Sequence, residues 1–361
     1  MKVALWLPKY NVPLDDPCCY PLGFMYMSSA IKGLGHNVTV FNNNLWKYDV
    51  SALLKFDVVC LTGFDEFKSE NESIIELCRN NGVHTVIGGA MATFGKISAD
   101  ATVIGEGELA IADALHSKGI FQNPVDVNLI TWPDYFGFGI EEYHRRHDTR
   151  YMGVLTSRGC PHNCTFCAHT CRYSCRRLEA VFYEIECYHK LFKLDVLVVN
   201  DNTLNPSKGR FRNFCTGMKK FKLAWSAALR LDNLDEDLVK LAKDSGLYYA
   251  VVGVESFQQN KLDMMNKKIT VEQIESGLDL LEKHNINYHG NVLFGFDGET
   301  DADVQIEYED MKRRKSRIFP TLLQSFSGID AVASDKVNRS EYSKEFYKYV
   351  TDRGMYTYPE A

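Results

Sequence analysis

The stretch TSRGCPHNCTFCAHT, residues 156–170, places three cysteines within eight residues: Cys160, Cys164 and Cys167, in the spacing C-x3-C-x2-C. Three thiolates this close together can hold one metal centre. Structural zinc sites use four ligands, usually as two separated pairs, and the chain has no second C-x2-C pair. A cube of four irons held by three cysteines would keep one iron open to another ligand. The spacing therefore favours an iron–sulfur centre over zinc.

The expected position of this loop also favours chemistry. Arg158 and Gly159 lead into it from an expected strand, and active sites of barrels lie at the carboxyl ends of strands. Apolar runs alternate with amphipathic segments from residue 151 onward, and 178–192 has apolar residues at helical spacing. Asp235 and Thr270 are expected to begin two further helices. With right-handed crossovers, this alternation predicts a partial (β/α)6 barrel over residues 151–327. Its expected strands are 153–157, 196–199, 224–229, 248–254, 288–294 and 321–326.

The first 120 residues predict a separate α/β domain, a Rossmann-like parallel sheet. Short apolar runs alternate with amphipathic stretches, and glycines sit where the strands should end, as at Gly88-Gly89 and in GEGE at 105–108. Residues 121–150 lose this periodicity and form an expected connector; its aromatic residues Trp132, Tyr135, Phe136 and Phe138 should be buried. Residues 328–361 form a short C-terminal tail. The expected strands are 3–7, 38–41, 58–62, 85–87 and 102–104, and the helices are 22–32, 69–80 and 108–117.

Composition limits the environment and the partners. The net charge of −6 gives no general attraction to nucleic acid or an anionic membrane, and no stretch approaches the ~18 apolar residues of a membrane span. The eleven cysteines are an odd number without a secretion signal, which favours a reducing cytoplasm over a disulfide framework. Cys171 and Cys175 follow the motif; they either pack as small residues or serve in redox chemistry or proton donation.

The cysteine motif, with Phe166 before its last cysteine, resembles the radical S-adenosylmethionine (SAM) superfamily. Two downstream segments agree: VVGVESF at 251–257 and VLFGFDGET at 292–300. The resemblance implies a [4Fe–4S] cluster on Cys160, Cys164 and Cys167, whose open iron chelates SAM. It implies reductive cleavage of SAM to methionine and a 5′-deoxyadenosyl radical. It also implies an external electron donor of flavodoxin or ferredoxin type.

The same resemblance implies further cofactor contacts. Glu255 would face SAM at the end of its strand, and Gly295 would end the strand whose backbone lies against adenine. Gly290, Val292 and Gly295 are spaced one residue looser than the common G-x-I-x-G pattern, which leaves the adenine contacts open by a residue. The remaining polar candidates could instead be turn or cap residues: Asn200, Asp201, Ser226 and Arg230.

The series of segments in residues 1–120 resembles the cobalamin-binding domain that precedes many radical SAM barrels. Cobalamin-binding domains of the mutase type carry D-x-H-x-x-G, and none of the ten histidines lies in that pattern. Cobalamin is therefore expected to bind without a protein imidazole below cobalt; alternatively, the domain keeps the fold and has lost the ligand. The residues expected to line the crevice are Thr62, Gly63, Gly88, Gly89 and Glu106.

These resemblances lead to three hypotheses about function. The first is a cobalamin-dependent radical SAM methyltransferase that acts on an unactivated carbon through methylcobalamin. The second keeps the radical and drops methylation, giving a cyclase, rearrangement or oxidation enzyme in which cobalamin is a non-methylating partner or absent. The third is a non-catalytic protein that binds cobalamin and an iron–sulfur cluster. The expected substrate is a small molecule, a peptide or a carrier-bound group, and nucleic acid is disfavoured.

Overall fold

The computed structural model describes residues 1–10, 21–62, 67–167, 172–296, 298–314 and 317–322. Internal contacts divide the chain into two compact units. The first comprises residues 1–159 and 170–198, and the second comprises residues 160–169 and 199–361. The expected domain boundaries at 120, 150 and 327 stay a prediction.

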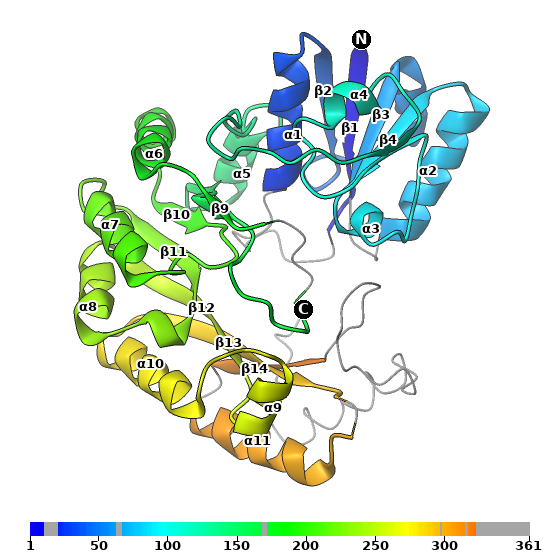
Figure 1. Cartoon of the computed structure of the whole chain (residues 1–361). Helices are drawn as coiled ribbons and strands as arrows, with labels where there is room; N and C mark the ends of the chain where they lie inside the picture. Colours follow the sequence, from blue (N-terminus) through cyan, green and yellow to red (C-terminus); the bar gives the residue numbers. More distant parts are fainter. Residues whose placement is uncertain (11–20, 63–66, 168–171, 297, 315–316, 323–361) are drawn as a thin grey trace. The chain divides into compact units, whose positions relative to one another are not determined.

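The first sheet is parallel, and its strand order is β2-β1-β3-β4-β5-β6. The chain moves outward from β1 to β2, then returns to the other side of β1, so the order reverses between β1 and β3. Figure 1 shows helices on both sides of this sheet. Its strands are β1 (Lys2–Leu7), β2 (Asn37–Asn42), β3 (Val58–Thr62), β4 (His84–Gly88), β5 (Ala101–Val103) and β6 (Gly119–Phe121).

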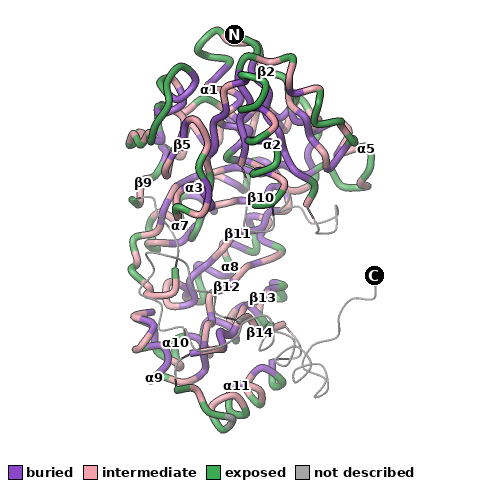
Figure 2. The backbone as a smooth tube through the Cα atoms, turned by 90° about the vertical axis from the view of Figure 1, so that its right-hand side faces the viewer, coloured by how far each residue is buried: buried purple, intermediate pink, exposed green. Residues whose placement is uncertain are grey.

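Apolar side chains on both faces of this sheet explain why helices cover both of its faces. In β1, residues 3–7 are all buried, as expected of a parallel strand between two helical layers. Ala4 and Trp6 pack in one core with residues of α2 (Lys68–Asn80) and the 3-10 helix η2 (Val50–Lys55). Figure 2 shows the burial along the backbone: β1, β3 and β5 are buried along most of their length, whereas β2 and β6 are mostly half-buried or exposed. The helices of the first unit also include α1 (Leu22–Gly33), α3 (Ala90–Thr93), α4 (Ile111–Ala114), α5 (Ile140–Arg146) and α6 (Leu178–Phe192).

The second sheet has six strands in the order β14-β13-β12-β11-β10-β7. Among the described strands β14 is the last, and it contains Pro320, which pairs in register with Val292 of β13. A two-stranded antiparallel ribbon, β8 (Ser157–Arg158) with β9 (Ser174–Cys175), flanks the cysteine loop in the sequence. The strands of the large sheet are β7 (Tyr151–Val154), β10 (Val196–Val199), β11 (Ala224–Leu229), β12 (Leu247–Glu255), β13 (Asn287–Phe294) and β14 (Ile318–Leu322).

The burial pattern of β12 shows which side chains face away from the helices. Ala250, Val252 and Val254 are buried, whereas Gly253 and Glu255 between and after them are half-buried. Because successive side chains of a strand point to opposite faces, Gly253 lies on the face opposite to the buried residues; Glu255 follows at the strand end, after an irregularity in the pairing with β13. Figure 1 shows α7, α8 and α10 along one side of the sheet. The helices of the second unit are α7 (Lys208–Met218), α8 (Glu236–Asp244), α9 (Gln259–Met264), α10 (Val271–Lys283) and α11 (Asp301–Arg313), with the 3-10 turn η4 (Leu231–Asn233).

The predicted α/β architecture, with two successive parallel sheets, is confirmed, and several details differ. The expected strand at 153–157 breaks into β7 and β8, and the expected strand at 321–326 begins earlier, as β14; residues 323–326 lie outside the described residues, as does the tail from 328. The expected helix at 108–117 shortens to α4, with residues 108–110 in a turn before it. Phe136 is 56% exposed, so its expected burial is wrong. The helix α5 forms inside the expected connector. Among the described residues, none of the helices is long and apolar enough to cross a membrane.

The N-terminus of α10 provides a test of the fold. The Thr270 side chain accepts a hydrogen bond from the backbone N–H of Gln273, and the Gln273 side chain accepts one from the N–H of Thr270. Replacing Thr270 by alanine removes this capping box and should lower the free energy of unfolding by about 1 kcal/mol. Urea denaturation measures the loss. Thr216→Ala, which removes a mid-helix hydroxyl bonded to the Arg212 carbonyl, should change it by less than about 0.5 kcal/mol; equal losses would contradict the capping role.

Candidate functional site

The cysteine loop is held by the loop that follows α9 in the second unit. The backbone N–H of Thr165 donates a hydrogen bond to the Met265 carbonyl at 3.0 Å, and the Asn266 side-chain amide donates to the Asn163 carbonyl at 2.8 Å. The N–H of Cys167 donates to the Cys164 carbonyl at 3.2 Å, which makes a turn between these two cysteines. Hydrogen bonds to the backbone therefore hold the residues on both sides of Cys164, one from a side chain and one from the backbone.

The three thiols suit an iron–sulfur cluster better than a single ion. None of the three is in a disulfide; Cys160 and Cys164 are half-buried, and Cys167 is exposed. Within the described ranges, no three His, Cys, Asp or Glu side chains converge as one metal ion would require. A cluster places its thiolates on different irons, so its cysteines need not converge on one point. Burial raises the pKa of the Cys164 thiol, and the charges of Lys267 and Arg230 oppose that rise, so two buried cations favour the thiolate that binds iron.

Lys267 is the clearest residue of this site that the sequence reasoning missed. Its ammonium lies 2.7 Å from the Glu255 carboxylate and 5.7 Å from the centre of the Phe166 ring. A side chain at Gly253 would meet the Lys267 Nζ at 2.5 Å, so glycine leaves the room for this ion pair. The backbone of Glu255 has φ 66°, a left-handed conformation that is uncommon outside glycine. No sequence motif places a lysine twelve residues after the glutamate, so the sequence carries no signal for Lys267.

Arg230 connects the end of β11 to the same loop. Its guanidinium forms two hydrogen bonds with the Asp232 carboxylate, at 2.9 and 2.8 Å, and donates a third to the Lys267 carbonyl at 3.2 Å. Asn205 binds both the N–H and the carbonyl of Arg230 at 2.8 Å. Ser226 is buried on β11, four residues earlier. The structure therefore brings Arg230, Glu255 and Phe166 together through Lys267.

The other expected SAM-site residues lie at strand ends of the second unit. Asn200 follows β10 and is half-buried, and Asp201 is buried. Gly295 follows β13 with φ 90°, and its N–H donates a hydrogen bond to the Glu299 carboxylate at 2.6 Å. Their contact with SAM stays a prediction.

The expected cobalamin crevice lies at the carboxyl edge of the first sheet. In such sheets, ligands bind where the strand order reverses, which here is between β1 and β3. Thr62 ends β3, and Gly88 and Gly89 follow one another at the end of β4; Gly89 has φ 85°. Gly63 lies outside the described residues, as does Cys171. Gly88 and Gly89 place backbone without side chains at this edge, and the binding of cobalamin there stays a prediction.

Glu106, the last expected crevice residue, is already engaged. The Arg158 guanidinium contacts the Glu106 carboxylate at 2.9 Å and also pairs with Glu108, and it lies 5.3 Å from the centre of the Tyr26 ring. Burial would lower the pKa of Arg158, but its bonds to the two carboxylates outweigh burial and raise it. A ligand that contacted the Glu106 carboxylate would therefore compete with Arg158.

This geometry defines a class: a protein built on successive parallel sheets, with three cysteines in a loop suited to an iron–sulfur cluster. Residues 154–311 match the sequence profile of the radical SAM superfamily. This segment is therefore similar to the radical SAM superfamily, and the similarity implies a [4Fe–4S] cluster and SAM as cofactors.

Known proteins resemble the chain well beyond that segment. It is 26% identical over 355 residues to an uncharacterized methyltransferase of Pyrococcus horikoshii, covering 84% of this chain and 76% of that protein. It is 25% identical over 385 residues to an anaerobic magnesium-protoporphyrin IX monomethyl ester cyclase of Rubrivivax gelatinosus, covering 92% and 69%. Its fold resembles that of the radical SAM methyltransferase TsrM from Kitasatospora setae, whose structure with cobalamin and a [4Fe–4S] cluster has a TM-score of 0.72 at 18% identity, covering 90% and 75%.

Proposed function

We propose that the chain is a cobalamin-dependent radical SAM enzyme and, within that class, a methyltransferase that acts on an unactivated carbon. The observation that carries the proposal is the extent of the fold likeness. It covers 90% of the chain and therefore includes the first sheet as well as the radical SAM segment. The methyltransferase relative supports the finer assignment.

The residues described above have distinct tasks in this proposal. Bound together, the cluster and SAM would supply a radical that abstracts hydrogen, and cobalamin would supply a transferable methyl group. Cys160, Cys164 and Cys167 would hold the cluster. Lys267 would orient the Glu255 carboxylate at the carboxyl end of β12 through their ion pair, and its ammonium would add positive charge beside the cluster loop. The glycines after β4 would let the backbone approach the corrin.

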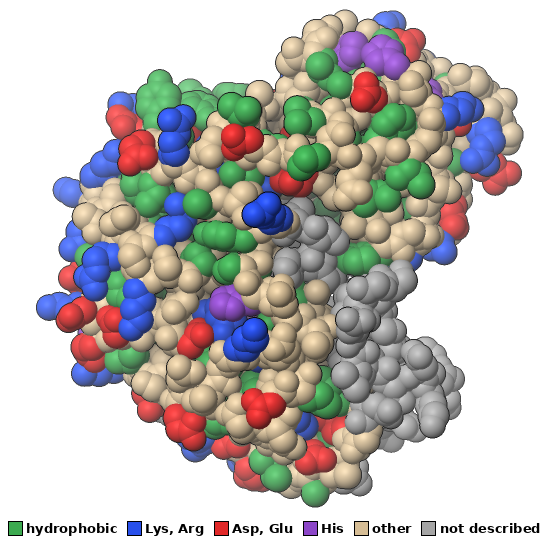
Figure 3. Space-filling view, in the orientation of Figure 1, with side chains coloured by type: hydrophobic (Ala, Val, Ile, Leu, Met, Phe, Trp, Pro, Cys, Tyr) green, Lys and Arg blue, Asp and Glu red, His purple; other side chains and the backbone are tan. Residues whose placement is uncertain are grey.

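The expected partners follow from the same chemistry. An external electron donor of flavodoxin or ferredoxin type would reduce the cluster, and a small-molecule, peptide or carrier-bound substrate would receive the methyl group. On the face drawn in Figure 3, Lys and Arg side chains are interspersed with Asp and Glu. Such a mixed surface does not favour nucleic acid, which requires a field of one sign.

The cyclase relative supports a second candidate function. The match to that cyclase covers 92% of this chain, and the match to the methyltransferase covers 84% of it. A cyclisation or oxidation would use the same radical and leave the methyl group of SAM unused. The two candidates therefore differ in whether a methyl group is transferred.

The decisive experiment is anaerobic reconstitution with iron, sulfide and hydroxocobalamin, followed by reduction with methyl-labelled SAM. The methyltransferase should retain cobalamin and about four irons per chain, and should release both 5′-deoxyadenosine and S-adenosylhomocysteine. 5′-Deoxyadenosine without S-adenosylhomocysteine would favour the cyclase candidate. Bound cofactors with neither product would indicate the non-catalytic alternative and overturn the proposal.

A further inference from the structure

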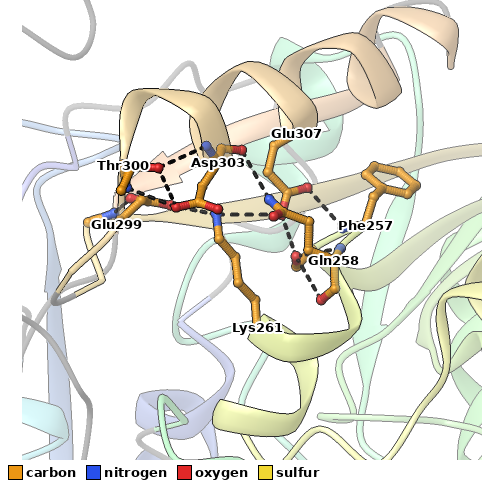
Figure 4. Close-up of polar contacts among 9 residues, drawn as sticks. Phe257, Gln258, Lys261, Glu299, Thr300, Asp303 and Glu307 are labelled. Carbon is orange, nitrogen blue, oxygen red and sulfur yellow. Dashed lines mark hydrogen bonds and ion pairs between the residues drawn. The ribbon is translucent and has the colours of Figure 1, made fainter.

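A buried lysine lies between two carboxylates behind the ends of β12 and β13. The Lys261 ammonium is 2.6 Å from the Glu299 carboxylate and 3.7 Å from the Glu307 carboxylate. All three side chains are nearly inaccessible, with exposed fractions of 5%, 4% and 0%. Figure 4 shows Lys261 rising from α9 toward Glu299 and toward α11, which carries Glu307. We call these three residues the buried triad.

Glu307 of the buried triad fixes the segment that follows Glu255. The Glu307 carboxylate accepts hydrogen bonds from the Phe257 N–H at 2.8 Å and from the Gln258 side-chain amide at 3.1 Å. It also accepts one from the Ser256 hydroxyl. These donors come immediately after Glu255, whose φ of 66° needs support from its neighbours. Glu307 therefore holds the backbone that positions the Glu255 carboxylate.

Glu299 of the buried triad fixes the turn that follows β13. The Glu299 carboxylate accepts the N–H of Gly295 at 2.6 Å and pairs with Lys261 through its second oxygen. The Lys261 ammonium also lies 5.7 Å from the centre of the Phe294 ring, the last residue of β13. The Gly295 turn is thus tied through one ammonium to the segment after β12.

We propose that Lys261, Glu299 and Glu307 are positioning residues that couple the two strand ends of the SAM site, so that neither end can move alone. This inference rests on the proposed function, because it assigns SAM to the ends of β12 and β13. Two carboxylates share one ammonium in a buried setting, where charges interact strongly. Displacing either carboxylate changes the balance of charge at the other. Burial raises the pKa of Glu307, and the hydrogen bonds from Ser256 and Phe257 and the charge of Lys261 oppose that rise.

Hydrogen exchange on the cofactor-free protein tests the coupling without any ligand. The variants are Glu307→Gln, which touches the segment after Glu255, and Glu299→Gln, which touches the Gly295 turn. We expect each variant to raise amide exchange about tenfold at both the peptide containing Phe257 and the peptide containing Gly295. Glu236→Gln is the matched control, because Glu236 pairs with Lys283 and His284 at the surface; it should change neither peptide.

Two results would overturn the coupling. The first is exchange that rises only at the segment that each variant touches. The second is an equal rise in the core strand β11, which would mean that the charges serve the whole fold. Lys261→Arg, which keeps the charge, should retain more protection at both peptides than Lys261→Met; equal exchange in the two variants would also contradict the proposal.

A second measurement separates the coupling from the proposed function. In reconstituted protein, equilibrium dialysis should show SAM affinity about tenfold weaker in Glu307→Gln, with the iron content unchanged. Coupled exchange together with weakened SAM binding supports both proposals. Coupled exchange with unchanged SAM affinity supports the coupling and counts against the assignment of SAM to these strand ends.

Discussion

Replacing Cys164 by alanine should abolish iron binding and SAM cleavage together. Loss of an outer-shell partner alone typically weakens metal binding 10- to 100-fold, so loss of one of three ligands should weaken cluster retention by at least about 100-fold. Cys164 is half-buried in the turn closed by the Cys167 N–H, so no neighbouring thiol replaces it without moving the backbone. The iron content and the 5′-deoxyadenosine released after reduction measure the loss.

Cys175→Ala is the matched control for this experiment. Cys175 is exposed and lies in β9, eight residues after the last cysteine of the motif. The Cys175→Ala protein should retain full iron content and full SAM cleavage. A Cys164→Ala protein that kept its iron and its cleavage activity would refute the cluster assignment, whereas loss in both variants would extend the site beyond the three motif cysteines.

Replacing Lys267 by methionine should produce the largest loss of stability among single changes at the site. Removing one partner of a buried ion pair typically costs 3–5 kcal/mol. Because 12% of the Glu255 side chain is exposed, we expect the lower end, about 3 kcal/mol. The midpoint of urea denaturation of the cofactor-free protein measures this loss of stability. SAM cleavage should fall as well, since the released Glu255 carboxylate is no longer oriented.

Two further variants show whether that loss of stability comes from the pair with Glu255. Lys267→Met combined with Glu255→Gln removes both charges and should recover most of the lost stability but not SAM cleavage. Lys283→Met breaks an exposed pair with Glu236 and should cost less than about 1 kcal/mol. A Lys267→Met loss as small as that of Lys283→Met would show that the Glu255 pair contributes little.

The elements with clear periodicity could be predicted from the sequence. The strands at 58–62, 196–199 and 224–229 and the helix at 178–192 have the expected bounds, because buried parallel strands are continuous apolar runs and an amphipathic helix repeats every 3.6 residues. The caps at Asp235 and Thr270 are also confirmed. Short elements such as β8 and β9 contain two residues each, too few to show any period.

The charged contacts of the site could not be predicted in the same way. Arg158 pairs with Glu106, 52 residues earlier, and Lys261 pairs with Glu299, 38 residues later. Such pairs depend on the register of neighbouring strands and on which face each helix buries, and neither is encoded locally. The cysteine spacing was informative because all three residues lie in one loop. Lys267 was missed because it lies in the loop after α9, whereas its partner Glu255 lies at the end of β12.

Pro320 affects how the protein behaves at high concentration. The Gly290 N–H donates to the Arg317 carbonyl, so in a parallel ladder the N–H of residue 319 faces β13 and the nitrogen of Pro320 faces away from it. β14 is last in the second sheet among the described strands, and its outward side therefore has a position without a hydrogen-bond donor. A proline at this position disfavours addition of a strand from another molecule. The chain thus carries a local safeguard against edge-to-edge aggregation within the sheet that would bind SAM.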